Sequence, residues 1–132
     1  AGIWERFGRP WVYADASGMG IPMVAELRDR GMRIVPITFT ATNKMEMIHR
    51  LEGDIQHRRI MFPDWEDLMR EFRAFVYDRT PSGRLTAASA GGYHDDIVAS
   101  LILMNEGFHQ RSGKSEGWGY NYLRDATPMV PA

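Results

Sequence analysis

Two adjacent aspartates, Asp95 and Asp96, are the residues whose types and spacing point most directly to chemistry, and His94 precedes them in the stretch GGYHDDIVASLILMNEGF. The apolar run behind them predicts a helix, so both carboxylates fall in a first turn, where the helix dipole favours an acid by roughly 0.3–1 kcal/mol. One carboxylate is enough for a cap, and a second adds repulsion unless a cation offsets it. Because Mg²⁺ and Mn²⁺ prefer carboxylate oxygens and need few protein ligands, the pair indicates either capping or part of a metal site. His94 fits a metal ligand, a general base, an orienting group for a carboxylate, or a turn residue without a task.

Asp15 is the second candidate ligand. It follows a short buried strand and precedes the turn Ser17-Gly18-Met19-Gly20, and the carboxyl ends of strands in open α/β sheets are where ligands bind. The competing interpretation is an aspartate that only stabilises a glycine turn. The turn matches neither GxxxxGK[ST] nor a full GxGxxG, so a nucleotide-cradling loop is not expected. If the strand end meets the helix start, Asp15 and the aspartate pair together form a Mg²⁺ or Mn²⁺ site.

Four basic residues are candidate DNA contacts: Lys44, Arg58, Arg59 and Arg84. The net charge of −1 creates no global positive field that would indicate a nucleic-acid partner. Fourteen of the sixteen basic residues are arginines, whose planar fork suits phosphate, although a composition bias of the source genome explains this equally well. The four residues therefore fit either DNA contacts or solvated surface.

Several classes of function are disfavoured. The sequence has no cysteine, which removes disulfides, thiolate metal sites and cysteine nucleophiles. No stretch reaches the roughly 18 apolar residues of a membrane span, so we expect no membrane partner. A hydrolase using Ser17, His94 and Asp95 has little support, because the sequence contains no G-x-S-x-G elbow.

The elements that must position these residues follow from apolar periodicity and turn signals. We expect a strand at 11–14, a helix at 21–31, a strand within 32–39 whose Pro36 indicates an edge position or a bulge, a helix behind a Thr42 or Asn43 cap, a helix behind an Asp64 cap, a hairpin around 81–83, a helix from 95 to about 107, and an irregular tail over 110–132. This order predicts an α/β fold built on a mixed sheet.

Four stretches combine these signals in a fixed order: VYADASGMG, VPITFTATNK, IMFPDWEDLMREFRAF and GGYHDDIVASLILM. They give a strand with an acid and a glycine turn, a strand with Phe-Thr and a lysine, a link with its helix, and a final acidic helix. In this order and spacing, over roughly residues 3 to 108, the chain resembles the nuclease domain of viral terminase large subunits, the motor proteins that package DNA into phage heads.

This resemblance implies a ribonuclease H-like fold, a mixed sheet flanked by helices, with two Mg²⁺ or Mn²⁺ ions held between acids from different elements. In such sites one ion helps to generate the attacking hydroxide and the other stabilises the leaving oxygen of a phosphodiester. By position, Asp15 resembles the family's second acid and Asp96 its third, with Asp95 beside it; the choice between Asp95 and Asp96 stays open. The implied activity is the cutting of concatemeric double-stranded DNA. The implied partners are an ATPase motor, a portal and a small terminase subunit, in the cytoplasm of the host cell.

One departure from the family's pattern matters. The family's first acid lies on an earlier strand, whereas Glu5 in IWERFG reads as helix. We therefore expect residues 1–109 to be the C-terminal part of a nuclease domain that is incomplete at its N-terminus, and its activity as an isolated chain to be impaired. The alternatives are a non-catalytic α/β module that binds DNA or a docking partner, and another ribonuclease H-like nuclease such as a relative of the resolvases.

Overall fold

The parallel pair β1 (Val12–Asp15) and β2 (Ile34–Ile37) forms one side of the protein, and α2 (Gly20–Asp29) connects the two strands. A computed structural model of the chain describes residues 2–83, 85–89 and 95–112. A small core of Ala16, Val24 and Ile34 lies between α2 and the strands. Among the described residues β2 pairs only with β1, so the predicted edge position of Pro36 is confirmed, and a missing N–H is tolerated there.

The helix α3 (Ala41–Gln56) begins two residues earlier than a Thr42 cap would allow. Thr40 is the N-cap: its Oγ1 accepts from the Asn43 backbone N–H at 3.1 Å, and the Asn43 side chain accepts from the Thr40 N–H at 2.7 Å. This reciprocal capping box satisfies two N–H groups at the end of the helix. The prediction of Thr42 or Asn43 as the N-cap is therefore wrong. Asn43 lies in the first turn of the helix and accepts there from the N-cap residue.

The next helix, α4 (Glu66–Ala74), has Trp65 rather than Asp64 at its N-cap position. The carboxylates of Glu66 and Asp67 in the first turn supply the favourable charge at this end of the helix. The predicted Asp64 cap is wrong for this reason. The helix ends at Ala74, because Phe75 already belongs to the following strand.

The antiparallel hairpin of β3 (Phe75–Arg79) and β4 (Leu85–Ser89) confirms the turn predicted around residues 81–83. Gly83 has a φ of +81°, a conformation that glycine adopts without strain, and its N–H donates to the Thr80 carbonyl at 2.8 Å. In the described residues the strands form two separate two-stranded sheets, one parallel and one antiparallel. The α/β class is confirmed, whereas one continuous mixed sheet is not seen in this part of the chain.

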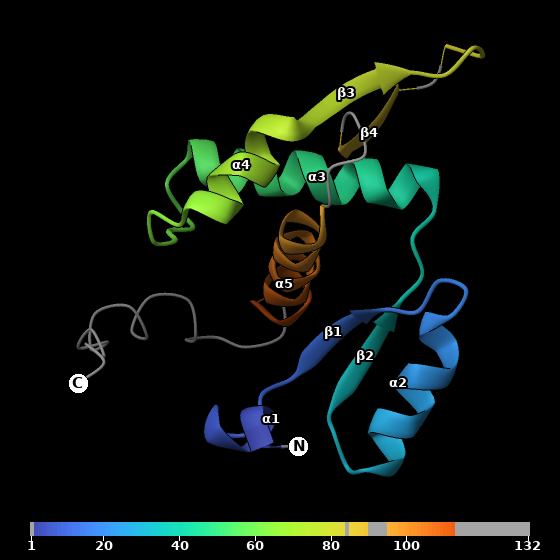
Figure 1. The fold of residues 1–132 in the computed structure, drawn as a ribbon, viewed down its shortest axis with the longest axis vertical. Coiled ribbons are helices and arrows are strands. Elements are labelled where there is room, and N and C mark those ends of the chain that lie inside the picture. The colour runs from blue at the N-terminus through green and yellow to red at the C-terminus, as the bar shows by residue number, and fades with distance from the viewer. Residues whose placement is uncertain (1, 84, 90–94, 113–132) are drawn as a thin grey trace.

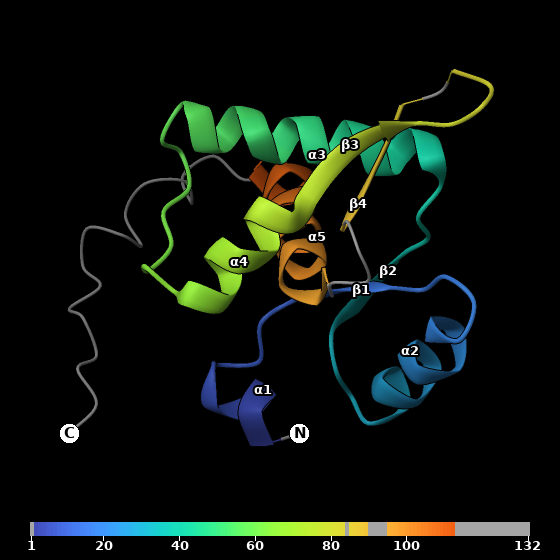
Figure 2. The same cartoon turned by 45° about the horizontal axis from the view of Figure 1, so that its top comes forward.

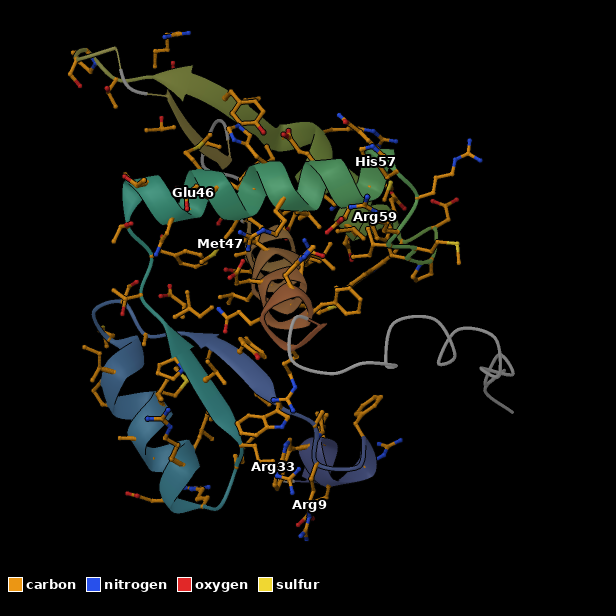
Figure 3. All side chains as sticks on the ribbon, turned by 180° about the vertical axis from the view of Figure 1, so that it is seen from behind. Arg9, Arg33, Glu46, Met47, His57 and Arg59 are labelled. Carbon is orange, nitrogen blue, oxygen red and sulfur yellow. The ribbon has the colours of Figure 1, made fainter. Side chains whose placement is uncertain are left out.

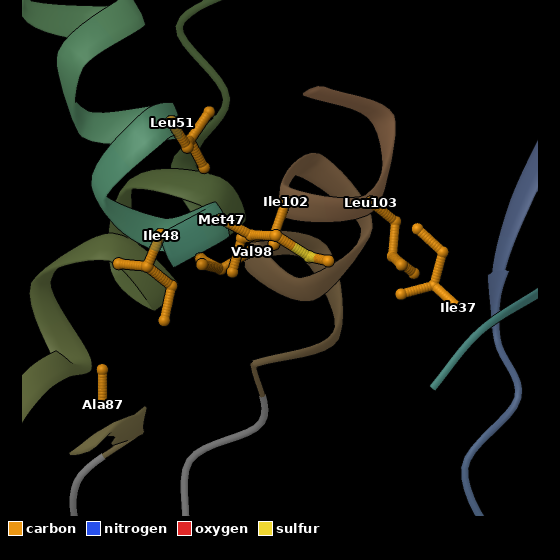
Figure 4. Packing of buried hydrophobic residues seen from close by; sticks show 8 residues of the cluster. All are labelled: Ile37, Met47, Ile48, Leu51, Ala87, Val98, Ile102 and Leu103. Carbon is orange, nitrogen blue, oxygen red and sulfur yellow. The ribbon is translucent and has the colours of Figure 1, made fainter. Parts of the chain in front are cut away.

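The last helix, α5 (Asp96–Ser112), lies between the β1–β2 pair and a layer formed by α3, α4 and the hairpin (Figures 1 and 2). It extends to Ser112, so residues 110–112 of the predicted tail are helical, and the rest of that tail lies outside the described residues. The main core gathers around α5 (Figure 4) and contains Ile37, Met47, Ile48, Leu51, Ala87, Val98, Ile102 and Leu103. The short helix α1 (Gly2–Arg6) precedes β1, as predicted for the segment around Glu5, and buries no residue. None of the helices within the described ranges has the length and apolarity needed to cross a membrane.

A buried carboxylate, Asp54, joins α3 to α5. Its Oδ2 accepts from Asn105 Nδ2 at 3.0 Å and lies 2.5 Å from His109 Nε2, and its Oδ1 accepts from Arg59 Nη1 at 3.3 Å. Burial alone would raise the pKa of Asp54, but the hydrogen bonds from His109, Asn105 and Arg59 and the charge of His109 outweigh it, so the pKa lies below its ordinary value of 3.8. The interaction fixes the C-terminal half of α5 against α3.

This network predicts a pH-dependent contribution to stability. Because the folded-state pKa of Asp54 is lower than the unfolded value of 3.8, its contribution is present above that value and is lost as the pH falls through the folded-state pKa. Asp54→Ala should lower the unfolding free energy by roughly 3–5 kcal/mol at neutral pH, since Arg59 and His109 lose their partner. Urea denaturation between acidic and neutral pH, with exposed Asp64→Asn as the control, tests this; a variant with the pH profile of the wild type would contradict it.

Candidate metal and DNA site

Asp15 ends β1 and shapes the turn that follows it. Its Oδ1 accepts from the Ser17 backbone N–H at 2.8 Å, and the Ala16 N–H donates to the Ile37 carbonyl at 2.8 Å, which continues the pairing with β2. A Cβ on Gly20 would collide with the Asp15 carbonyl, so the turn requires glycine at that position. Asp15 thus stabilises the turn through one oxygen, and its side chain remains exposed at the end of the strand. Its role as a metal ligand stays a prediction.

Lys44 is linked to this turn by Phe39, which contacts both Ser17 and Lys44. The Phe39 N–H donates to the Ser17 Oγ at 3.1 Å, and Lys44 Nζ lies 5.8 Å from the centre of the Phe39 ring. Ser17 is therefore a structural hydrogen-bond acceptor that ties the turn to the chain after β2. The predicted DNA contact Lys44 and the predicted ligand Asp15 lie at the same end of the β1–β2 pair.

Two side-chain contacts set the direction of α5 across β1. A Cβ on Gly107 would collide with the ring of Tyr13, which shows that the helix packs directly on this ring. One turn later, Arg111 Cζ lies 4.6 Å from the centre of the Trp11 ring. Because α5 advances from residue 107 to 111 while its contacts on β1 move back from 13 to 11, the two elements run antiparallel. The N-terminal end of α5, with Asp95 and Asp96, therefore points toward the end of β1 that carries Asp15.

The N-terminus of α5 has a cap that comes from another helix. Glu71 of α4 accepts through Oε2 from the backbone N–H groups of Ile97 and Val98, at 2.8 and 3.0 Å. These are among the N–H groups that the first turn of a helix leaves without an internal partner. Since Glu71 supplies the capping carboxylate, the side chains of Asp95 and Asp96 are not needed for that purpose.

The donor chemistry of these aspartates suits Mg²⁺ or Mn²⁺, because all three offer carboxylate oxygens. Asp15 and Asp96 are exposed and Asp95 is half-buried, so a hydrated ion has access to them. Within residues 2–83, 85–89 and 95–112, however, no group of three or more Asp, Glu or His side chains is arranged to hold a metal ion. The described part of the chain thus has suitable donors at one end of the fold without a complete set of ligands.

The remaining predicted residues fall elsewhere. His94 and Arg84 lie outside the described residues. Arg58, which has a φ of +55°, and Arg59 follow the C-terminal end of α3, a helix of 16 residues that has Lys44 in its first turn. Figure 3 shows Arg59 beyond this end of the helix. Arg59 also binds Asp54. The structure does not bring these two arginines together with Lys44, and their contact with DNA stays a prediction.

The sequence interpretation missed Glu71. A signal for it exists, because Glu71 lies between Leu68 and Phe72 on the face of α4 that packs inward. A carboxylate on an apolar face requires a partner, since burying an unpaired charge is costly. The sequence also predicts that the helix ends at about Gly107, whereas Gly107 lies inside α5 at a close approach to Tyr13.

Comparison with known proteins identifies the class of fold. The solved large terminase nuclease from thermophilic phage G20c, in a structure with bound magnesium, is 30% identical to this chain with a TM-score of 0.73, and the match covers 80% of this chain and 56% of that one. The G20c structure with bound cobalt matches equally well. The nuclease domain of the Thermus phage P74-26 large terminase is 27% identical with a TM-score of 0.69, over 91% of this chain and 59% of that one. The fold is therefore ribonuclease H-like, as expected from the sequence.

Within this class, the chain is a homologue of the nuclease domain of phage terminase large subunits. The large terminase subunits of Thermus phage G20c and Thermus virus P23-45 are each 30% identical to it over 110 residues, which is 83% of this chain. The chain spans 23% of the length of these two relatives. No family model matches the sequence.

The close approach of α5 to β1 predicts opposite effects for two helical glycines. Gly107→Ala should lower the unfolding free energy by about 1–3 kcal/mol, because the added methyl group collides with Tyr13. Gly53→Ala in α3 meets no atom within 4 Å and should raise it by up to about 1 kcal/mol through helix propensity. Chemical denaturation of both variants makes the measurement, and equal effects would contradict the proposed packing.

The cap from α4 predicts local fraying when it is removed. Glu71→Ala leaves the N–H groups of Ile97 and Val98 without their acceptor and should cost about 0.5–2 kcal/mol. Native-state hydrogen exchange should show faster exchange at these two amides. Glu66→Ala, an exposed glutamate of the same helix, should leave their exchange unchanged. Unaltered protection of Ile97 and Val98 in Glu71→Ala would show that Glu71 does not cap α5.

Proposed function

We propose that this chain is the acid-bearing part of a metal-dependent endonuclease module that cuts concatemeric double-stranded DNA during viral genome packaging. The observation that carries the proposal is the capping of α5 by Glu71. It supplies a capping carboxylate from another helix, and the N-terminal end of α5, with Asp95 and Asp96, points toward the end of β1 that carries Asp15. Homology to terminase nucleases solved with magnesium or cobalt supports the same interpretation.

In this proposal Asp15 and Asp96 are the principal ligands of Mg²⁺ or Mn²⁺, and Asp95 is a further ligand or an electrostatic partner. A bound divalent ion would supply charge stabilisation to the phosphodiester and help to ionise the attacking water, in a two-ion arrangement when the ligand set is complete. The Ser17 N–H orients Asp15 by holding its Oδ1. Glu71 acts indirectly, because it fixes the turn from which Asp96 projects.

The remaining assignments concern the whole protein. Duplex DNA is its substrate, with Lys44, Arg58, Arg59 and Arg84 as candidate phosphate contacts. An ATPase motor domain, a portal and a small terminase subunit are its partners, and it acts in the cytoplasm of the infected cell. A non-catalytic role of this part of the chain in binding DNA is the second candidate, which the lack of a three-ligand group among the described residues favours.

Because the described residues hold no group of three ligands, we expect weak metal binding and poor cleavage by the 132-residue chain alone. In a Mn²⁺ titration followed by NMR, the amides around Asp15 and Asp96 should broaden with a dissociation constant on the order of 1 mM. Asp15→Asn and Asp96→Asn should each remove most of this broadening, whereas Asp64→Asn should not.

Two outcomes would contradict parts of this proposal. Broadening that centres on other residues, or none at millimolar Mn²⁺, would refute the ligand assignment and favour the non-catalytic role. Efficient Mn²⁺-dependent plasmid cleavage that Asp15→Ala abolishes would show that the chain alone suffices, which contradicts the impairment while supporting the site.

A further inference from the structure

The two outer edges of the β1–β2 pair differ in their ability to accept another strand. The Val12 and Ala16 N–H groups donate to carbonyls of β2, and successive residues of a strand point their backbone groups to opposite sides, so the N–H and C=O of Tyr13 point away from β2. The Ile37 carbonyl faces β1, so by the same alternation Pro36 belongs to the outer edge of β2, where it offers no N–H. The outer edge of β1 is therefore the one that can pair further, and within the described residues no third strand pairs with it.

The two faces of the pair are already covered. Val12 and Ala14 pack on one face with the small core of α2, and Tyr13 contacts α5 on the other. Figure 1 shows α2 and α5 on different sides of the two strands. A further partner of the parallel strands can therefore add at the edge of β1 and not on a face.

An apolar stripe follows one side of α5. Ile97, Leu101, Met104 and Phe108 succeed one another at spacings of four, three and four residues, which places them along one side of a helix. Met104 is 49% exposed and Phe108 is 50% exposed. We call these four residues the α5 stripe. Its C-terminal half presents large apolar side chains to water.

The α5 stripe lies on the side of α5 that extends beyond the outer edge of β1. Leu103 packs with β2 and Gly107 packs on β1, so moving around the helix from Leu103 to Gly107 leads from β2 to β1. At roughly 100° per residue, Met104 and Phe108 lie about 60° and 100° beyond Gly107 in this same direction. The stripe and the edge of β1 therefore form one continuous surface.

We propose that this surface is the interface of a symmetric dimer, in which the outer edges of β1 from two copies pair antiparallel around Tyr13. A residue whose N–H and C=O both point outward can exchange two hydrogen bonds with the same residue of a second copy across a two-fold axis. Both copies of α5 then lie on the same face of a four-stranded sheet and run antiparallel. Met104 and Phe108 of one copy cover the same residues of the other.

Charge complementarity favours a second copy as the occupant. Arg111 lies over Trp11 at one end of the edge, and Asp15 ends the strand at the other. Antiparallel pairing around Tyr13 places Trp11 of each copy opposite Asp15 of the other, so unlike charges meet at both ends of the interface. The net charge of −1 adds little repulsion between two copies.

The test measures the oligomeric state of the whole chain in EDTA, so that its outcome does not depend on the proposed metal ligands. Sedimentation between about 2 and 200 µM should show a monomer–dimer equilibrium with a dissociation constant on the order of 10 µM. Hydrogen exchange of the Tyr13 amide should slow as the protein concentration rises. The Ile34 amide, which shares the outer edge of β2 with Pro36, should exchange at a rate that does not depend on concentration.

A matched pair of double variants tests the α5 stripe. Met104→Glu with Phe108→Glu should raise the dissociation constant at least about tenfold, because the dimer would bury two carboxylates without partners. Met61→Glu with Phe7→Glu replaces the same residue types at positions that are 73% and 74% exposed and should leave the dissociation constant unchanged. Thermal unfolding verifies that each variant folds, and the exchange measurement on the wild-type chain stands without any variant.

Three results would overturn the proposal: a monomer over the whole concentration range, a dimer that the two double variants weaken equally, or a dimer in which the exchange of Tyr13 does not change. The first would assign the surface to a strand from a different polypeptide, and the other two would place the dimer interface on another face. None of them bears on the proposed metal ligands, which the Mn²⁺ titration tests separately.

Discussion

The packing of α5 on Tyr13 at Gly107 is the constraint on which the arrangement of this protein depends. A helix with any larger residue at this position would be held away from β1, because a Cβ there overlaps the ring. Because α5 approaches β1 so closely, it packs against both halves of the fold. Val98 and Ile102 face the α3 layer, and Leu103 packs with Ile37 of β2. A single close contact thus couples the parallel strands, the main core and the direction in which the aspartate pair points.

The carboxylates of the protein fall into two groups with different physical roles. Asp54 and Glu71 are held by several hydrogen bonds each, and Glu106 pairs with Arg50 and accepts from Gln110 at 3.0 Å. These acids join helices that are distant in sequence. Asp15 and Asp96 are exposed, at strand and helix ends, where a charge keeps its hydration until a ligand replaces it. This division explains how so short a chain can place exposed acids at one end without losing its packing.

The elements of the fold were largely predictable, because their signals are local. The hairpin follows from Pro81-Ser82-Gly83. The helix α3 follows from the spacing of Met45, Ile48, Leu51 and Ile55, of which Ile48 and Leu51 are buried in the core and the other two pack against it. Helix starts were less predictable: Thr40 and Trp65 replaced the expected caps, since a side chain in the first turn can take over that role. The candidate acids at Asp15 and Asp96 were visible from their positions after a strand and before a helix. The place of Glu71 on an apolar helix face indicates that it has a partner, but not which one, because its partners are backbone groups about 26 residues later in the chain.

The long-range cap also determines when the acidic end of α5 can become ordered. A first helical turn cannot satisfy its own N–H groups, and here α4 supplies an acceptor for two of them. The turn that carries Asp96 therefore gains this stabilisation only when α4 docks, which closes a loop of 26 residues at an entropic cost. α4 leads without a linker into β3, so the hairpin, the docking of α4 and the first turn of α5 belong to one cooperative unit. Local unfolding at the hairpin would then affect Asp95 and Asp96 more readily than Asp15, because the turn of Asp15 is held by the parallel strands.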